Sequence, residues 1–381
     1  MPVVSGARQG ERQGVGMGHG NMKGCAQTVL GAVDAKELGI TMMHEHLLWD
    51  VRRLFVEPED PTERAMAHAP VSLENLSYVV LNWAGCEDNL VNSDTELAIR
   101  EAGLFKQAGG KTLVDVSNIG LGRDPKSLRY IAESTGLHIV MGASYYQAFF
   151  HPPDMDDKSE DEIFEEVVGD ITEGVDGTDI RAGIIGEVGC NWPLRDNEAK
   201  VLRASARAQT ETGAPITIHP GPHLDAPFEI IDILEAAGAD TERVVIGHME
   251  RTGLDLDHLT NLAKRGCYLE FDWFGEVRPT FMKHGTKQSD DPSHYVSPGR
   301  VDVPSDGERI KIISFLVSEG FGEKIVVSQD ICLKSRMTSF GGPGYAHITR
   351  YVQTWMREMG LGDGDIENIV VNNPQRILGF V

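Results

Sequence analysis

The stretch GITMMHEHLL, residues 39–48, combines a short apolar run with two histidines two positions apart. Side chains two positions apart in a β-strand point to the same side. His44 and His46 are therefore expected to face one way, while Glu45 points to the other side. A histidine pair of this kind is weak evidence for a metal site by itself, so its meaning depends on the rest of the fold.

Seven more short β-rich apolar runs follow, and segments of helical composition such as residues 198–212 separate them. These runs lie at residues 111–117, 138–144, 182–188, 215–219, 243–248, 266–272 and 324–330. Alternating strands and helices with continuously apolar strands are typical of a parallel sheet covered by helices. An open dinucleotide-binding sheet would need a Gly-x-Gly-x-x-Gly turn after a strand, and none is placed there. The sequence predicts an α/β fold, a (β/α)8 TIM barrel in a single domain.

Two connections are much longer than the usual length of about two to six residues. They cover residues 49–91, after the first run, and residues 273–304, after the seventh. Both follow the C-terminal ends of strands, where barrel enzymes build their sites, so we expect lids or specificity loops. Residues 1–21 are Gly-rich and polar without the apolar segment of a signal peptide. They are expected to form a flexible tail, and residues 22–381 the barrel.

The charge balance restricts the class of partner. The chain has 35 Lys and Arg against 58 Asp and Glu, a formal net charge of −23, which disfavours nucleic acid and anionic membrane surfaces. The five cysteines are scattered without a CxxC pair, which is typical of a reducing compartment. We expect a cytoplasmic protein that acts on a small molecule, with no nucleic-acid or membrane partner.

Further ligand-type residues lie at the ends of four later runs, and a barrel brings strand ends around one mouth. Buried polar groups there cost desolvation energy unless they are paired or bind a metal. A single catalytic zinc usually takes three protein ligands, so a larger set indicates two ions. The predicted metal ligands are His44, His46, Glu187, His219, His248 and Asp330.

The order of these residues around the barrel suggests how two ions would share them. His44, His46 and Asp330 would hold one ion, and the histidines that end the fifth and sixth runs would hold the other. Glu187 lies between the two groups, so its two oxygens could bridge the ions. Mixed imidazole and carboxylate ligands suit Zn, although Mn, Fe, Co and Ni are also compatible.

These motifs resemble the phosphotriesterase-related family of the amidohydrolase superfamily. The resemblance extends over about residues 22–381 and includes GASYYQAFFHP (142–152), IGHMERT (246–252), SQDICLKSRMTSFGGPGYAHI (328–348) and NNPQRIL (372–378). It implies a binuclear metal-dependent hydrolase and carries the family's metal ligands onto the six residues above. The best-studied members have a carboxylated lysine where this chain has Glu187. Other members have glutamate there, so Glu187 is expected to bridge directly.

The resemblance also suggests catalytic residues. Asp330 is placed to take a proton from a metal-bridging hydroxide and pass it to the leaving group. Tyr146 matches a tyrosine that lies beside the metals in lactone-hydrolysing members, with aromatic packing as the alternative. Arg251 could bind a substrate carboxylate or phosphate, with a surface salt bridge as the alternative. Asp272 is a candidate to orient Arg251 or another group.

The leading hypothesis is attack of the bridging hydroxide on a small ester or lactone. Amide hydrolysis of an N-acyl compound is the closest alternative, and phosphotriesters would be a side activity. A barrel that binds metal without catalysis is disfavoured, because all six ligand positions are filled. The resemblance also suggests a homodimer.

Overall fold

The computed structural model describes residues 22–251, 255–278, 280–281 and 301–381. The predicted tail, residues 1–21, lies outside the described residues, as does much of the predicted loop 273–304. The division of the chain into a tail and a barrel therefore remains a prediction.

Within the described residues, eight strands form one sheet in the order β14-β11-β10-β9-β8-β7-β6-β3. Neighbouring strands run parallel throughout. Their bounds are β3 (Thr41–Glu45), β6 (Thr112–Asp115), β7 (His138–Ala143), β8 (Ile184–Gly189), β9 (Ile216–His219), β10 (Val244–Ile246), β11 (Tyr268–Phe271) and β14 (Ile325–Val327). Each strand overlaps one of the eight apolar runs, and the predicted (β/α)8 barrel is confirmed.

The barrel closes where the first strand meets the last. The backbone N–H of Asp330 donates to the carbonyl of His44 at 3.1 Å. The backbone N–H of His44 donates to Ser328 Oγ at 3.0 Å. This junction joins the predicted histidine motif to the predicted ligand that follows β14.

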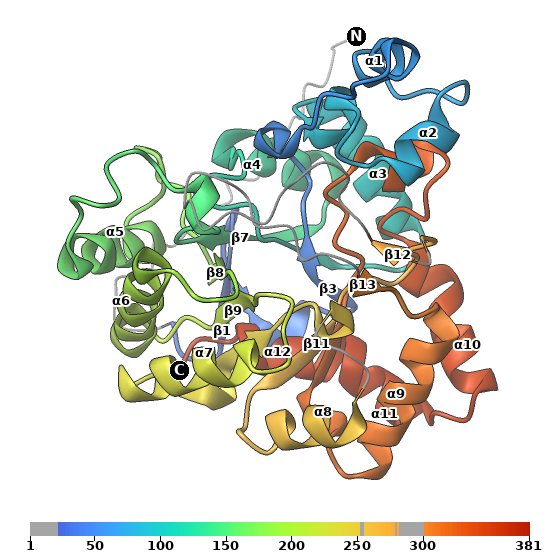
Figure 1. Ribbon diagram of the computed structural model, residues 1–381. Coiled ribbons are helices and arrows are strands. Elements are labelled where there is room, and N and C mark those ends of the chain that lie inside the picture. Colours follow the sequence, from blue (N-terminus) through green and yellow to red (C-terminus); the bar gives the residue numbers. More distant parts are fainter. Residues whose placement is uncertain (1–21, 252–254, 279, 282–300) are drawn as a thin grey trace, which may run out of the picture.

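Helices surround the strands on the outside (Figure 1). Their bounds are α3 (Thr95–Gln107), α4 (Pro125–Thr135), α5 (Glu160–Thr172), α6 (Asp196–Thr212), α7 (Ala226–Ala236), α8 (Leu256–Ala263), α9 (Asp306–Ser318), α10 (Gln353–Glu358), α11 (Asp363–Glu367) and α12 (Asn373–Leu378). The ends of α4 show the usual helix-capping residues. The Asp124 side chain caps the start of α4 with Pro125 next, and Gly136 ends the helix in the left-handed conformation at φ 64°. None of the described helices is long and apolar enough to cross a membrane.

The segment after β3 has secondary structure of its own. It contains the short strand β4 (Trp49–Asp50), helices α1 (Pro61–Ala67) and α2 (Leu76–Leu81), and strand β5 (Val91–Asn92), which pairs antiparallel with β4. After β11, β12 (Thr280–Phe281) pairs antiparallel with β13 (Val301–Asp302). A hairpin of β1 (Cys25–Thr28) and β2 (Gly31–Asp34) precedes the barrel, and Phe380 donates to Cys25 there at 2.9 Å.

Candidate metal centre

The six predicted ligands meet at the C-terminal ends of the barrel strands, and all six are buried. His44 lies in β3, Glu187 in β8, and His219 at the last residue of β9. The other three follow directly on strands, since His46 comes after β3, and His248 and Asp330 come two and three residues after β10 and β14. Far-separated parts of the chain thus supply one cluster.

The first group consists of His44, His46 and Asp330, whose candidate ligand atoms all lie within 4.8 Å of one another. Asp330 Oδ1 is 3.3 Å from His46 Nε2 and 3.8 Å from His44 Nε2. Neither ring nitrogen of His44 has a hydrogen-bond partner among the described residues, although the side chain is fully buried. A buried imidazole without hydrogen bonds is costly, and a bound cation at Nε2 would remove that cost.

The second group consists of Glu187, His219 and His248. His219 Nδ1 is 2.9 Å from Glu187 Oε2 and 2.7 Å from His248 Nε2. His248 Nε2 is 3.6 Å from Glu187 Oε2. Two ligand atoms on neighbouring strands and one from the residues after the next strand therefore lie close together.

Glu187 contacts both groups. Its Oε1 is 3.5 Å from His46 Nε2, and its Oε2 is 3.4 Å from His44 Nε2. The same Oε2 is the atom closest to His219. A carboxylate in this position has the donor atoms that a bridging ligand needs.

The charges of the cluster favour cations. Burial alone would raise the pKa of the carboxyl groups of Glu187 and Asp330. His44 and His219 instead hold the pKa of Glu187 well below its ordinary range, and His46 does the same for Asp330. Burial and the neighbouring Arg251 lower the pKa of His219 to about 3. Against the effect of burial, the neighbouring carboxylates raise the pKa of His44, His46 and His248, so this part of the cluster stabilises positive charge. A bound cation would replace the protons of these rings. Two ionised carboxylates among imidazoles are a donor set that suits divalent ions.

Outer contacts orient three of the four imidazole rings, those of His44, His46 and His248. Ser117 Oγ donates to the Leu48 carbonyl at 3.0 Å, so it accepts from His46 Nδ1 at 2.9 Å and leaves Nε2 for a metal. Asp272 accepts from His248 Nδ1 at 2.8 Å. On the other side of His44, Nδ1 lies 3.4 Å from Glu270 Oε2. Each of these three contacts turns an Nε2 atom towards the carboxylates.

Of the three outer residues, one was predicted from the sequence and two were not. Asp272 was expected to orient Arg251 or another group, and that group is His248. Ser117 and Glu270 were missed. Glu270 and Asp272 repeat the two-residue spacing of His44 and His46, which is a signal that could have identified Glu270. Ser117 carried no signal of its own.

Two of the three predicted catalytic side chains, Tyr146 and Arg251, lie beside His219. Tyr146 Oη is 3.1 Å from His219 Nδ1 and 3.3 Å from Nε2. Arg251 Nη1 is 2.9 Å from His219 Nε2. Both line the cavity above the ligands, so the structure brings them to the site, while their catalytic roles remain predictions.

This cavity has a volume of about 90 Å³. Val51, Leu54 and Trp83 from the long connection after β3 form part of its wall, and Trp273, Glu276 and Arg278 come from the segment after β11. Both long connections thus contribute to the cavity, as the barrel layout predicts. The mixture of apolar and aromatic walls with a few charged groups is typical of a small-molecule site.

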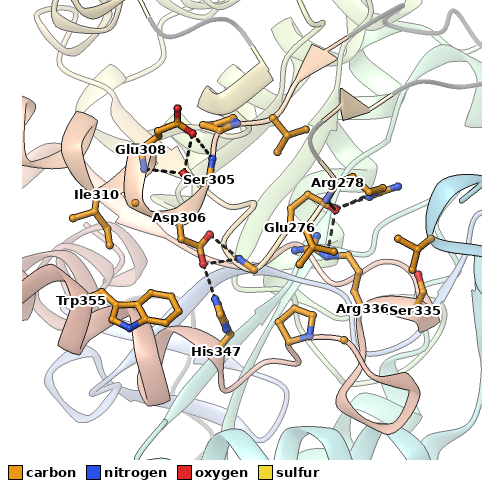
Figure 2. Close-up of a pocket in the computed structure, with 18 of the residues that line it drawn as sticks. Glu276, Arg278, Ser305, Asp306, Glu308, Ile310, Ser335, Arg336, His347 and Trp355 are labelled. Atoms are coloured by element: carbon orange, nitrogen blue, oxygen red, sulfur yellow. Dashed lines mark hydrogen bonds and ion pairs between the residues drawn. The ribbon is translucent and has the colours of Figure 1, made fainter. Parts of the chain in front are cut away.

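A larger pocket of about 960 Å³ lies next to it and shares Glu276, Arg278 and Arg336 as a wall (Figure 2). Arg278 Nε donates to Glu276 Oε1 at 2.8 Å, and Arg336 Nε lies 3.8 Å from Glu276 Oε2. Arg278 and Arg336 hold the pKa of Glu276 at about 2 against the effect of burial, so this wall stays charged.

Comparison with known proteins agrees with this geometry. The model of the phosphotriesterase family matches residues 24–378. The chain belongs to the phosphotriesterase family. As in the family generally, the chain is a hydrolase, and its clustered His, Asp and Glu side chains could bind metals.

Curated relatives in the phosphotriesterase family match nearly the whole chain. The N-acetyltaurine hydrolase of Homo sapiens is 38% identical over 361 residues, covering 94% of this chain and 99% of the relative. The N-acetyltaurine hydrolase of Dictyostelium discoideum is 40% identical over 379 residues, covering 94% and 98%.

Solved structures share the phosphotriesterase-family barrel. A resiniferatoxin-binding protein from Rhodobacter sphaeroides superposes with a TM-score of 0.85 and 36% identity, over 93% of this chain and 95% of that one. A lactonase from Listeria monocytogenes superposes with a TM-score of 0.72 and 26% identity, over 94% and 99%.

Proposed function

We propose that this phosphotriesterase-family chain hydrolyses the amide bond of a small N-acyl compound at a centre of two divalent ions. The pair of adjacent ligand groups that Glu187 joins is the observation that carries the hydrolytic centre. The choice of an amide rests on the relatives named N-acetyltaurine hydrolase, which match over 94% of this chain. The products would be a carboxylate and a free amine.

The first ion would be held by His44, His46 and Asp330, and the second by His219 and His248, with Glu187 shared between them. Bound ions would supply a water of lowered pKa and a Lewis acid for the acyl oxygen. Zn suits these ligands, and Mn, Fe, Co and Ni remain compatible.

Asp330 would move the proton. His46 holds the pKa of Asp330 well below the ordinary range against the effect of burial, so Asp330 is ionised. One of its carboxylate oxygens would receive the proton of the attacking water. Trp273 Nε1 donates to Oδ2 at 3.1 Å, which fixes the plane of the carboxylate. The accepted proton would then pass to the leaving amine.

Arg251 would bind an anionic end of the substrate, such as the sulfonate of an N-acyltaurine. When Nδ1 of His219 faces Glu187 as a ligand, Nε2 carries the proton and cannot accept a hydrogen bond from Arg251. The guanidinium is then available for a substrate anion, which it can bind with two parallel hydrogen bonds.

A lactone or ester is the second candidate substrate. Tyr146 favours it, because its hydroxyl lies 3.1 Å from His219 Nδ1 and could donate to a ring oxygen of a bound lactone. The similar lactonase structure from Listeria monocytogenes also supports it, at 26% identity. Phosphotriester hydrolysis would be a side activity of the same centre.

Partners and location stay proposals as well. We propose a small-molecule substrate, no nucleic-acid or membrane partner, a homodimeric assembly and a cytoplasmic location. The net charge of −23 supports the exclusion of nucleic acid.

A substrate panel tests the proposed reaction. Metal-loaded chain would be assayed on N-acetyltaurine, a neutral N-acetyl amide of the same length, a γ-lactone and an aryl acetate. We expect the highest kcat/KM for an amide and loss of turnover with a chelator. A lactone with a higher kcat/KM than both amides would shift the assignment to the second candidate. No turnover of any substrate by a chain that carries its metals would contradict the proposal.

A further inference from the structure

We propose that Glu45, the residue between the two histidines of the HEH motif, is a positioning residue that holds Asp330 in the geometry of the metal centre. This inference rests on the proposed function, because it takes Asp330 as a metal ligand. Glu45 itself points away from the centre and would touch neither metal nor substrate.

The Glu45 carboxylate is fully buried and accepts three hydrogen bonds from the segment that follows β14. Oε1 accepts from Ser328 Oγ and from the backbone N–H of Gln329, both at 2.8 Å. Oε2 accepts from the backbone N–H of Ile331 at 3.0 Å. The two backbone donors belong to the residues on either side of Asp330, so Glu45 fixes the peptide on both sides of the ligand.

The backbone at Asp330 needs such support. Its φ of 50° lies in the left-handed region, which residues other than glycine rarely adopt because it is strained for them. Further contacts hold the same backbone, since its N–H donates to the His44 carbonyl at 3.1 Å and its carbonyl accepts from Arg336 Nη1 at 2.9 Å and from the N–H of Cys332 at 3.1 Å. Without the carboxylate of Glu45, the flanking N–H groups would be buried without partners, and the chain could relax to a commoner conformation.

The alternative is that Glu45 only stabilises the fold by closing the barrel between β3 and β14. The chain provides a matched control for this alternative. Glu101 is also a buried glutamate that accepts three hydrogen bonds from the segment after β14, from Thr338 N at 2.8 Å, Ser339 N at 2.8 Å and Ser339 Oγ at 2.6 Å. Its partners lie eight and nine residues beyond Asp330, so loss of Glu101 removes similar contacts without reaching the ligand.

The substitution Glu45→Gln is the most direct test. A glutamine can accept with one oxygen only, and its NH2 group would meet the N–H of Ile331, donor against donor. We expect the affinity for one of the two ions to fall roughly tenfold to hundredfold, the range seen when a contact that orients a metal ligand is lost. Glu101→Gln should lower the unfolding midpoint by about as much as Glu45→Gln does. Unlike Glu45→Gln, it should leave the affinity for both ions unchanged.

The readout is metal stoichiometry by elemental analysis, together with the visible spectrum of the Co²⁺-loaded chain, which reports the coordination of each ion. A second step combines Glu45→Gln with Asp330→Ala. If Glu45 acts through Asp330, the substitution has no further effect on metal affinity in a chain that lacks the Asp330 carboxylate. Equal losses in both backgrounds would overturn the proposal.

Three further outcomes are decisive. If Glu45→Gln and Glu101→Gln have the same metal affinities as each other and the same unfolding midpoint, Glu45 is only structural. If Glu45→Gln does not fold, Ser328→Ala replaces it, because Ser328 Oγ donates to Glu45 and accepts from the N–H of His44. We expect the same selective loss there, and unchanged affinities would again overturn the inference. A wild-type chain that binds no metal would instead contradict the proposed function.

Discussion

Asp272 accepts two hydrogen bonds from His248, one from the backbone N–H and one from ring Nδ1, both at 2.8 Å. The pair fixes the imidazole orientation and holds a backbone whose φ of 55° lies in the left-handed region. Burial would lower the pKa of His248, but Asp272 raises it to about 9, because the carboxylate stabilises positive charge on the ring. The same interaction would strengthen His248 as a ligand.

Asp272→Asn is therefore expected to weaken binding of the ion held by His219 and His248 by roughly tenfold to hundredfold. The amide can still accept one hydrogen bond but brings no charge. Metal titration of the apo chain, with the two binding steps resolved, would measure this. Unchanged affinity for both ions would show that Asp272 has no influence on His248 as a ligand.

Asp330→Asn separates proton transfer from metal binding. An asparagine oxygen in the same place can still coordinate, but the amide cannot take a proton. We expect the chain to keep most of its metal while kcat falls by about 10²-fold or more, the usual contribution of a general base. The measurement is kcat alongside metal content, and near-wild-type kcat would rule out the proposed role of Asp330.

Glu187 needs no covalent modification to act as a bridge, unlike a carboxylated lysine. Reconstitution of the apo chain with divalent metal should therefore give the same activity with and without added bicarbonate. Assays in carbonate-free and bicarbonate-supplemented buffer would show this directly. A marked increase in activity with bicarbonate would count against a direct Glu187 bridge.

Burial lowers the pKa of His151 from 6.5 to about 4. Its Nε2 donates to the Tyr146 carbonyl at 2.8 Å, and Nδ1 has no hydrogen-bond partner in the described part of the chain. As the pH falls, His151 binds a proton near pH 6.5 in the unfolded chain but only near pH 4 in the folded chain. Stability is therefore lost as the pH falls through this window, by roughly 3 kcal/mol for a group shifted this far.

His151→Gln retains a donor for Tyr146 but does not titrate. Its free energy of unfolding should fall less than that of the wild type between pH 6.5 and pH 4. Denaturant unfolding of both metal-free chains across this range would measure the difference, without the separate effect of acid on metal binding. Parallel pH curves for the two chains would contradict the prediction.

The strands and the positions of the candidate ligands at their ends could be predicted, because both follow from short-range patterns. Apolar runs mark β9 and β10, and His219 and His248 lie at or just after the ends of those strands. A closed barrel then requires these ends to meet around one mouth. The helices and strands of residues 49–91 were not predicted, because short elements in a long connection leave little periodicity.

The contacts that support the candidate ligands could not be predicted from such local patterns. Glu45 and its partners are 283 to 286 positions apart in the sequence, and its carboxylate contacts the backbone behind Asp330 rather than the candidate ligand atoms. Ser117 contacts His46 across 71 positions. Contacts of this kind depend on the register between strands, which no local pattern states. For the same reason the left-handed backbone of Asp330 emerged only from the structure.

Two ions joined by Glu187 are the central claim, and electron paramagnetic resonance of the Mn²⁺-loaded chain tests it most directly. Two Mn²⁺ ions that share a bridging carboxylate should give two equivalents of metal per chain and the spectrum of an exchange-coupled pair. One equivalent per chain, or two ions with the spectrum of isolated Mn²⁺, would contradict the claim.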